Sequence, residues 1–235
     1  MDNVPPLPES AKLQTGCYGK LPAHGDFISR QLPQGFIQPW DQWLQQSISA
    51  SRELLGEQWL DTYLTSPIWH FALSPGLLDE HAWLGLMSPS VDSVGRYFSF
   101  CMALQLPEMS SAIASFYHNT EWFLGLENLA ISALEDRLDA DSIEASLMRM
   151  QATVVACLPG SSSSYVSLQN SASGDALASA GVMLEYLAAE KHAPFSFWRT
   201  SGSPLVTPCI SLSPGLPNAE LFTSMMNSGW QPELD

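Results

Sequence analysis

Three aromatic-rich runs, separated by short turn signals, constrain the fold of this 235-residue chain more than any other feature. The runs are Ile68–Leu73, Ala82–Met87 and Arg96–Leu104. Each has the length of a strand, and each is followed by a turn or break that contains proline. Such runs, bounded by Pro, Gly and Ser, predict strands. Because only short connections separate them, we expect consecutive strands to pair antiparallel as a meander.

Helical periodicity lies on both sides of these runs. Before them, apolar residues at helical spacing predict a helix from Pro39 to Leu55, with the proline at its start and Gly56 at its end. The apolar positions are Phe36, Trp40, Trp43, Leu44, Ile48 and Leu55. After the runs, residues 113–134 form a long helical region that we expect to break near Gly125. Asp141 to Glu144 then resembles a helix-starting cap.

The remaining segments complete the fold prediction. Gly16–Leu21 is expected to form a first strand, and Ser196–Arg199 is expected to pair with Cys209–Leu212 in a final hairpin before a short last helix. Asp175 is expected to cap a helix that precedes this hairpin. Strands in clusters, rather than in strict alternation with helices, indicate the α+β class. We therefore predict a mainly antiparallel central sheet of about five to six strands packed by helices, an α/β/α-type sandwich.

The domain organisation follows from composition along the chain. Residues 1–12 contain three prolines and no periodicity, so a disordered Pro-rich tail is expected there. Residues 13–235 are expected to form a single globular domain, with a motif-rich part over 15–107 and a less distinctive part over 108–235. The serine-rich segment 158–175 is the best candidate for a mobile loop or a boundary.

Charge excludes several function classes. The formal net charge is −15, from nine basic and 24 acidic residues, and no run of basic residues exists. Nucleic acids and anionic membranes are therefore not expected partners, since both attract clustered Lys and Arg. No secretory signal and no apolar run of bilayer length is present. Four scattered cysteines (Cys17, Cys101, Cys157, Cys209) fit reduced, mostly buried residues, so the cytoplasm is the expected compartment.

The usual catalytic and cofactor motifs are missing. There is no GxSxG elbow, Walker loop, HExxH or GxGxxG that opens a helix. The five histidines never lie three to five residues apart, so no local zinc site and no other cofactor is expected. The serine run over residues 161–164 is interpreted as solvated linker rather than as a source of nucleophiles.

Two polar clusters lie among apolar surroundings. The first occupies the stretch YGKLPAHGDFISR and contains Lys20, His24, Asp26 and Arg30. In this stretch glycine permits a bend, Asp26 bonds its backbone, and Phe27 is expected to anchor it in the core.

The second cluster is the segment from Ser90 to Arg96, a turn between two strands. Asp92 is expected to accept backbone N–H bonds there, and Gly95 to supply a special backbone dihedral angle. Arg96 is expected to pair with a carboxylate, either Asp92 or Asp26, as a structural anchor. A partner surface is the second interpretation of this segment, and catalysis the third.

With these elements in hand, the chain resembles the TagF (ImpM) family of type VI secretion system proteins. The family pattern of an aromatic residue before Gly-Lys-Leu-Pro, then Gly-Asp-Phe, matches Tyr18–Pro22 and Gly25–Phe27. Three further elements match in order, and they are Trp40-Asp41-Gln42-Trp43-Leu44, Pro67-Ile68-Trp69 with Phe71 and Leu73, and Pro89-Ser90 with Asp92 and Gly95-Arg96-Tyr97-Phe98. Phe197-Trp198 and Gly215-Leu216-Pro217 match more loosely. His24 departs from the small or basic residue expected there.

The resemblance implies a regulatory protein without catalytic residues. It implies post-translational repression of type VI secretion in the cytoplasm, through binding of the forkhead-associated scaffold protein of the system. Candidate partner-binding residues are Lys20, His24, Asp26 and Arg30, of which Lys20, Asp26 and Arg30 are expected to be the most exposed. Residues assigned a structural role are Gly25, Phe27, Trp40, Trp43, Trp69, Ser90, Asp92, Gly95 and Arg96. The alternative hypothesis is a hydrolase or transferase that uses His24, Asp26 or Asp92.

Overall fold

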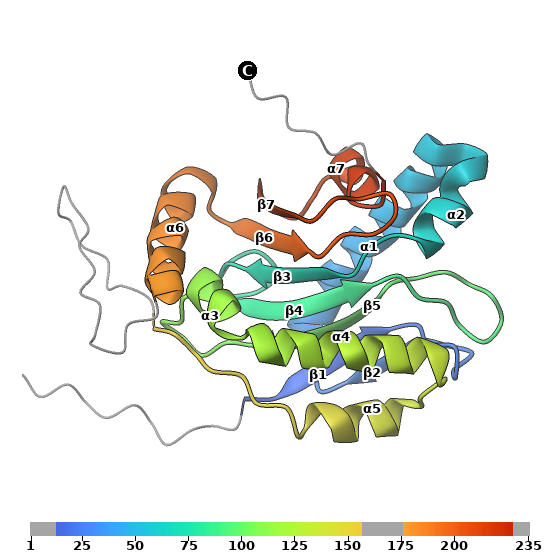
Figure 1. The fold of residues 1–235 in the computed structure, drawn as a ribbon, viewed down its shortest axis with the longest axis horizontal. Coiled ribbons are helices and arrows are strands. Elements are labelled where there is room, and N and C mark those ends of the chain that lie inside the picture. Colours follow the sequence, from blue (N-terminus) through green and yellow to red (C-terminus); the bar gives the residue numbers. More distant parts are fainter. Residues whose placement is uncertain (1–12, 157–175, 228–235) are drawn as a thin grey trace, which may run out of the picture.

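The computed structural model describes residues 13–156 and 176–227, and its centre is one antiparallel sheet (Figure 1). The strands are β1 (Thr15–Gly19), β2 (Ile28–Arg30), β3 (Trp69–Leu73), β4 (Trp83–Ser88), β5 (Phe100–Gln105), β6 (Phe195–Thr200) and β7 (Cys209–Pro214). Their order across the sheet is β2-β1-β5-β4-β3-β6-β7, and every neighbouring pair is antiparallel. The predicted α+β class and antiparallel sheet are confirmed. The sheet has seven strands rather than five or six.

The predicted meander forms the middle of the sheet. β3 pairs with β4, and β4 pairs with β5, with Gly85 opposite both Phe71 and Ala103. The amino-terminal hairpin β1–β2 extends this meander at the β5 edge, and the carboxyl-terminal hairpin β6–β7 extends it at the β3 edge. The first and last strands of the chain therefore lie on opposite sides of one meander.

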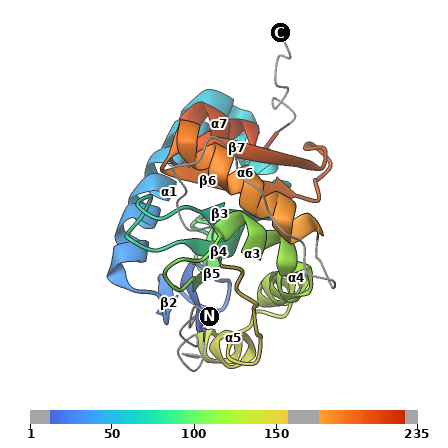
Figure 2. The same ribbon diagram turned by 90° about the vertical axis from the view of Figure 1, so that its left-hand side faces the viewer.

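Helices cover both faces of the sheet. They are α1 (Gln34–Leu55), the short 3-10 helix η1 (Gly56–Gln58), α2 (Trp59–Leu64), α3 (Ala112–His118), α4 (Thr120–Glu135), α5 (Ala140–Leu147), α6 (Ala176–His192) and α7 (Ala219–Ser224). Figure 2 shows α1 on one face, and α3, α4 and α6 on the other. None of the helices in the described residues is long and apolar enough to cross a bilayer.

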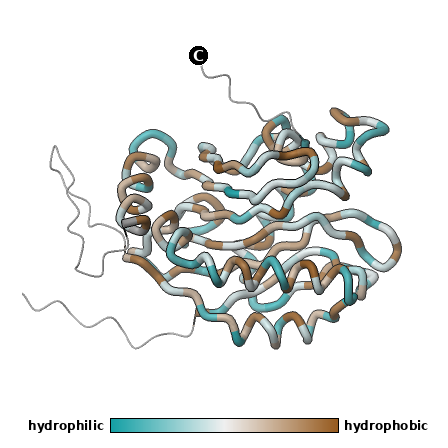
Figure 3. Tube along the Cα trace, in the orientation of Figure 1, coloured by the Kyte–Doolittle hydropathy of each residue, from teal (hydrophilic) through white to brown (hydrophobic). Residues whose placement is uncertain are grey.

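Two hydrophobic cores follow from the alternation of side chains along each strand. On one face Leu84, Met102 and Phe197 pack with α3, α4 and α5. On the other face aromatic residues of the strands pack with α1, including Phe71 and Trp198. Figure 3 shows the matching alternation of hydrophobic and hydrophilic residues along α4 and α5. Each face of the sheet is thus buried under amphipathic helices.

The tryptophans of the predicted stripe lie in the second core. Trp40 and Trp43 on α1 are 0% and 9% exposed, and Trp69 on β3 is buried beside them in the same cluster. The Trp43 indole N–H donates to the carbonyl of Pro217 at 2.7 Å, and that of Trp69 donates to Met225 at 3.1 Å. These two bonds attach the segment around α7 to the rest of the second core.

Several predicted boundaries are wrong. α1 begins at Gln34, after Pro33, and Pro39 lies inside the helix. The long helical region breaks at Asn119, not near Gly125, because the Asn119 side chain bonds the backbone of Ser115 and of Thr153. The cap of α5 is Asp139, whose carboxylate accepts from the Ser142 N–H.

Other predictions fall outside the described residues. They are the tail at 1–12, the serine-rich segment 158–175, the Asp175 cap and the state of Cys157. Among the described cysteines, Cys17 and Cys101 are buried and Cys209 is partly buried, all as free thiols. Burial raises the pKa of Cys17 to about 12, so this thiol stays protonated at neutral pH.

Candidate functional site

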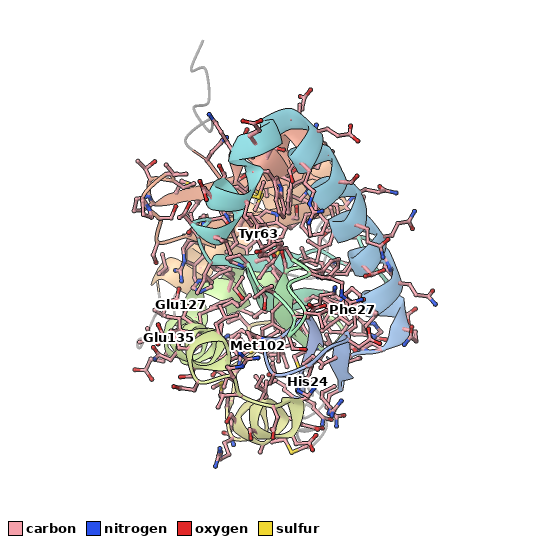
Figure 4. The ribbon with its side chains drawn as sticks, turned by 90° about the vertical axis from the view of Figure 1, so that its right-hand side faces the viewer. His24, Phe27, Tyr63, Met102, Glu127 and Glu135 are labelled. Carbon is pink, nitrogen blue, oxygen red and sulfur yellow. The ribbon has the colours of Figure 1, made fainter. Side chains whose placement is uncertain are left out.

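Two loops that carry the family-like motifs meet at one end of the sheet. The first loop follows β1 and contains Lys20 to Phe27, and the second follows β4 and contains Pro89 to Ser99. The Ser93 N–H donates to the carbonyl of His24 at 2.8 Å, which joins the two loops directly. Figure 4 faces this end of the molecule, with His24 beside α5, Phe27 beside α1, and Tyr63 above them.

Asp92 organises both loops. One of its carboxylate oxygens accepts from the backbone N–H groups of Val94 (3.0 Å) and Arg96 (2.8 Å), and the other accepts from Lys20 Nζ (3.0 Å) and Arg96 Nε (2.6 Å). The Asp92 side chain has no exposed surface. Burial alone would raise the pKa of Asp92, but the bonds from Arg96, Lys20 and Val94 outweigh it and hold the pKa well below its usual range. The turn is therefore built around a carboxylate that is ionised at neutral pH.

Arg96 extends this network to the first loop. Its guanidinium donates to Asp92 through Nε and also to the carbonyl of Gly25. Gly95 has a φ of 86°, a left-handed conformation that favours glycine, and its N–H donates to the Asp92 carbonyl at 3.1 Å. Of the two carboxylates considered from sequence, Arg96 pairs with Asp92.

The expectation that Lys20 is exposed is wrong. The residue is 5% exposed, and its ammonium lies 3.0 Å from Asp92 and 5.0 Å from the centre of the Phe27 ring. An ammonium group is buried here because a carboxylate and an aromatic face replace its hydration. Lys20 thus supports the two loops from beneath.

Ser90 fastens the second loop to α2 and to the first loop. Its hydroxyl donates to the carbonyl of Lys20 at 2.6 Å. Its backbone N–H donates to the Tyr63 hydroxyl at 3.0 Å, and that hydroxyl donates back to the Ser90 carbonyl at 3.1 Å. Burial raises the pKa of Tyr63 to about 12, so the phenol remains a donor at neutral pH. The base of the site is therefore held by buried, neutral hydrogen bonds as well as by charge.

Above this base lies a surface that we call the motif-loop surface and define as residues 23–27 and 93–96. All of these residues are exposed except His24, which is partly buried. Asp26 is exposed, Val94 is 68% exposed, and Phe27 is 40% exposed. The prediction that Phe27 is anchored in the core is therefore wrong. Its ring stacks on the ring of Tyr18 and makes a T-shaped contact with the ring of Phe98, with ring centres 5.6 and 4.8 Å apart. Phe27 is fixed in position and still presents apolar surface to solvent.

The flank of this surface is formed by α5. His24 Nε2 accepts from the backbone N–H of Ala140 at 3.0 Å, so His24 completes the capping of the first turn of α5. Arg30, on β2, lies 2.9 Å from Asp141 and 3.3 Å from Glu144. Both ion pairs are at the surface, and Arg30 keeps about a third of its side chain exposed.

Sequence reasoning missed a second polar cluster, on the face of the sheet that packs against α3 and α4. His70 on β3 is 3% exposed, with Nδ1 3.1 Å from an Arg199 nitrogen and Nε2 2.9 Å from a Glu127 oxygen. Although Nε2 is close to Glu127, it makes no hydrogen bond of acceptable geometry with any described residue. Burial, with Arg199 nearby, lowers the pKa of His70 to about 3. No motif relates these three residues, because they come from β3, α4 and β6.

The residues of the enzyme hypothesis are already engaged. Asp92 accepts four bonds, Asp26 accepts from the N–H of Phe27 at 2.9 Å, and His24 accepts from Ala140. The arrangement does not pair a nucleophile with a general base, as this hypothesis requires. Over residues 13–156 and 176–227, no three His, Cys, Asp or Glu side chains gather as metal ligands would.

Comparison with known proteins finds the family that the sequence motifs resemble. The family described as the TagF N-terminal domain, type VI secretion system-associated, matches residues 16–150. This range contains β1 from its second residue, β2 to β5, α1 to α5 and the whole motif-loop surface. No curated protein matches the chain.

One solved structure is similar over nearly the full length. It is the crystal structure of PA0076 from Pseudomonas aeruginosa PAO1, with 32% sequence identity and a TM-score of 0.81. The match covers 93% of this chain and 96% of that one. Because the family model matches more than half of its length, the chain belongs to the TagF N-terminal domain family of type VI secretion system-associated proteins.

Proposed function

We propose that this protein represses type VI secretion after translation, in the cytoplasm, by binding the forkhead-associated scaffold protein of the system through the motif-loop surface. One observation carries the proposal: the motifs on the two loops converge on a single exposed surface. The buried part of the motifs, Lys20, Ser90 and Asp92, holds this surface in one conformation. Buried motif residues that hold exposed side chains in place favour binding of a protein partner over catalysis of a reaction.

The composition of the surface fits a protein interface. Phe27 and Val94 offer exposed apolar groups, with the charged side chains of Asp26 and Arg96 beside them. Apolar anchors with a polar rim are the usual arrangement of binding hot spots. Because Asp92 and Arg96 fix the loops beforehand, little conformational entropy is lost when a partner binds.

The candidate residues contribute in different ways under this proposal. Asp26 is a direct contact, and Arg30 a contact at the rim beside α5. Lys20 and His24 act indirectly, by holding the loops on Asp92 and on the first turn of α5. The net charge of −15 favours encounter with a basic region of the partner, so binding weakens as salt is added.

A binding assay with matched variants tests the surface. Purified protein is titrated against the purified scaffold, with Val94→Glu and Phe27→Ala as the test variants. We expect each to weaken binding about tenfold or more, since each removes an apolar anchor. Leu124→Glu is the control, because Leu124 is 55% exposed on α4, outside the motif-loop surface. Equal binding by all three variants would move the interface to another face.

A cellular assay tests the regulatory role itself. Overproduction of the protein should reduce secretion of the needle-tube protein of the system, and deletion should increase it. Overproduction of Val94→Glu at the same level should reduce secretion less. If secretion did not respond to overproduction and the purified protein did not retain the scaffold, the proposed function would be wrong.

A further inference from the structure

Among the described residues, β7 is the last strand at one edge of the sheet. β7 pairs with β6 on one side, and no described strand pairs with its other side (Figure 1). Alternate residues of such a strand direct their backbone N–H and C=O groups outward, where another strand can bind them. Ile210 on β7 is also 56% exposed, and Leu205, in the loop before it, is 40% exposed.

This edge lacks the charges that usually protect one. Natural edge strands are commonly blocked by lysine or other charged side chains. Here residues 200–218, which include β7 and its flanking loops, contain no Asp, Glu, Lys or Arg, although the chain has a net charge of −15. Two copies of so acidic a protein repel each other over most of their surface. The uncharged segment 200–218 is where a second copy meets least repulsion.

The sequence of β7 is also complementary to itself. Pro208 and Pro214 lie at equal distances on either side of Ser211. An antiparallel pair of β7 strands centred on Ser211 therefore places each proline opposite the other proline of the partner copy. Proline cannot donate to a ladder, so this register leaves both prolines at the ends. The outward-directed backbone groups among the five residues between them can then pair.

We propose that a second copy of this chain binds along β7, antiparallel and centred on Ser211, so that two sheets join into one across a two-fold axis. This register places Ile210 opposite Leu212 of the second copy, on the face where Leu212 lies beside Phe197. On the other face it places Ser211 opposite Ser211 and Cys209 opposite Ser213. The contact is isologous, so it closes as a dimer and does not grow into a filament.

The first test measures the mass of the full-length protein in solution. Sedimentation equilibrium should show a shift from one copy (25.7 kDa) to two as concentration rises, over a range on the order of 1–100 µM for so short a ladder. Ile210→Glu should reduce dimerisation about tenfold or more, since two like charges are then added to the paired edges. Leu54→Glu is the control, because Leu54 is equally exposed (59%) near the end of α1.

The second test fixes the register. Antiparallel neighbours lie about 4.5–5.5 Å apart at Cα, within the range that a disulfide needs. Ser213→Cys should therefore form an oxidised dimer with Cys209 of the second copy, visible on a non-reducing gel. The double variant Ser213→Cys with Cys209→Ser should not form it, and neither should Pro214→Cys, which is out of register.

The outcomes separate clearly. A protein that remains a monomer over the whole concentration range, with no cross-link in Ser213→Cys, overturns the proposal. A dimer that survives Ile210→Glu and fails to cross-link uses another face, and also overturns it. Scaffold binding through the motif-loop surface does not depend on this edge, so either proposal can fail alone.

Discussion

Removing the charge of a buried carboxylate that neutralises two cations costs much stability, because a buried cation is then left without a partner. Asp92→Asn would leave the Lys20 ammonium buried and unpaired, and it would weaken the bonds from Arg96. Breaking a buried ion pair in this way costs about 3–5 kcal/mol. We expect a loss of this size in the free energy of unfolding, measured by urea denaturation at pH 7.

The control for this prediction is Asp26→Asn, which changes an exposed carboxylate one loop away. Surface substitutions of this kind usually stay within about 0.5 kcal/mol. The pKa of Asp92 is depressed in the folded protein, so its contribution is present above the unfolded pKa and is lost as pH falls below about 4. An Asp92→Asn variant as stable as Asp26→Asn would show that the loops are held by other contacts.

His70 gives a pH dependence of the same sign in a higher window. Its pKa is about 3 in the folded protein, whereas a histidine in an unfolded chain titrates near about 6.5. Between these values the unfolded chain binds a proton that the folded protein does not, so stability falls as pH drops through the window. We expect His70→Gln to reduce this slope by up to about 1.4 kcal/mol per pH unit in denaturation series from pH 7 to pH 4.

Two charged neighbours of His70 set the size of this effect. Arg199 opposes protonation of the imidazole, and Glu127, whose pKa is raised by burial, offsets part of the slope as it takes up a proton itself. A wild-type protein and a His70→Gln variant with parallel pH profiles would mean that His70 titrates normally. The burial of Lys20 and of His70 was not predictable from sequence, because Asp92 and Arg199 lie 72 and 129 residues away from them.

At the scale of elements, the strands of the meander were predictable and several helix boundaries were not. The runs that became β3, β4 and β5 are aromatic-rich and sit between turn residues, so local pattern and tertiary structure agree. β2 has three residues and shows no pattern of its own. The start of α1 was missed because Pro33 precedes it without a side-chain cap, so the sequence carries no start signal there.

The two tryptophans of α1 should respond differently to loss of the indole N–H. Trp40 is fully buried and its N–H has no partner among the described residues, whereas the N–H of Trp43 is bonded to Pro217. Phenylalanine at either site leaves a small cavity, but at Trp43 it also leaves the Pro217 carbonyl unpaired. We expect Trp43→Phe to cost about 1 kcal/mol more than Trp40→Phe in thermal or urea denaturation.

Truncation to alanine gives the scale for this comparison. Trp40→Ala and Trp43→Ala should each cost about 3–5 kcal/mol, as large buried aromatic residues do. Losses below about 1 kcal/mol at both sites would show that α1 packs through another face. The apolar stripe would then become a candidate partner surface.

At the scale of the whole molecule, the range that matches the family model ends before the last two strands of the sheet. The match stops at Met150, but the β3 edge of the meander pairs with β6, which begins at Phe195. A chain truncated after Met150 would expose that edge together with the aromatic core beneath Trp198. We expect it to lose cooperative unfolding and to bind a hydrophobic dye strongly, whereas the full-length chain should melt in one transition. A cooperative, dye-free melt of the truncated chain would mean that β6 and β7 are dispensable.

The same strand order has a consequence for synthesis on the ribosome. Synthesis of β3 ends at Leu73, but synthesis of β6, which pairs with one side of β3, ends only at Thr200, 127 residues later. At about 5–20 residues per second, the inner strand of the finished sheet spends roughly 6–25 s as an outer strand. During that interval neighbouring nascent chains present the same unprotected edge to one another. We expect slower translation of the second half of the message to increase the aggregated fraction, and faster translation to reduce it.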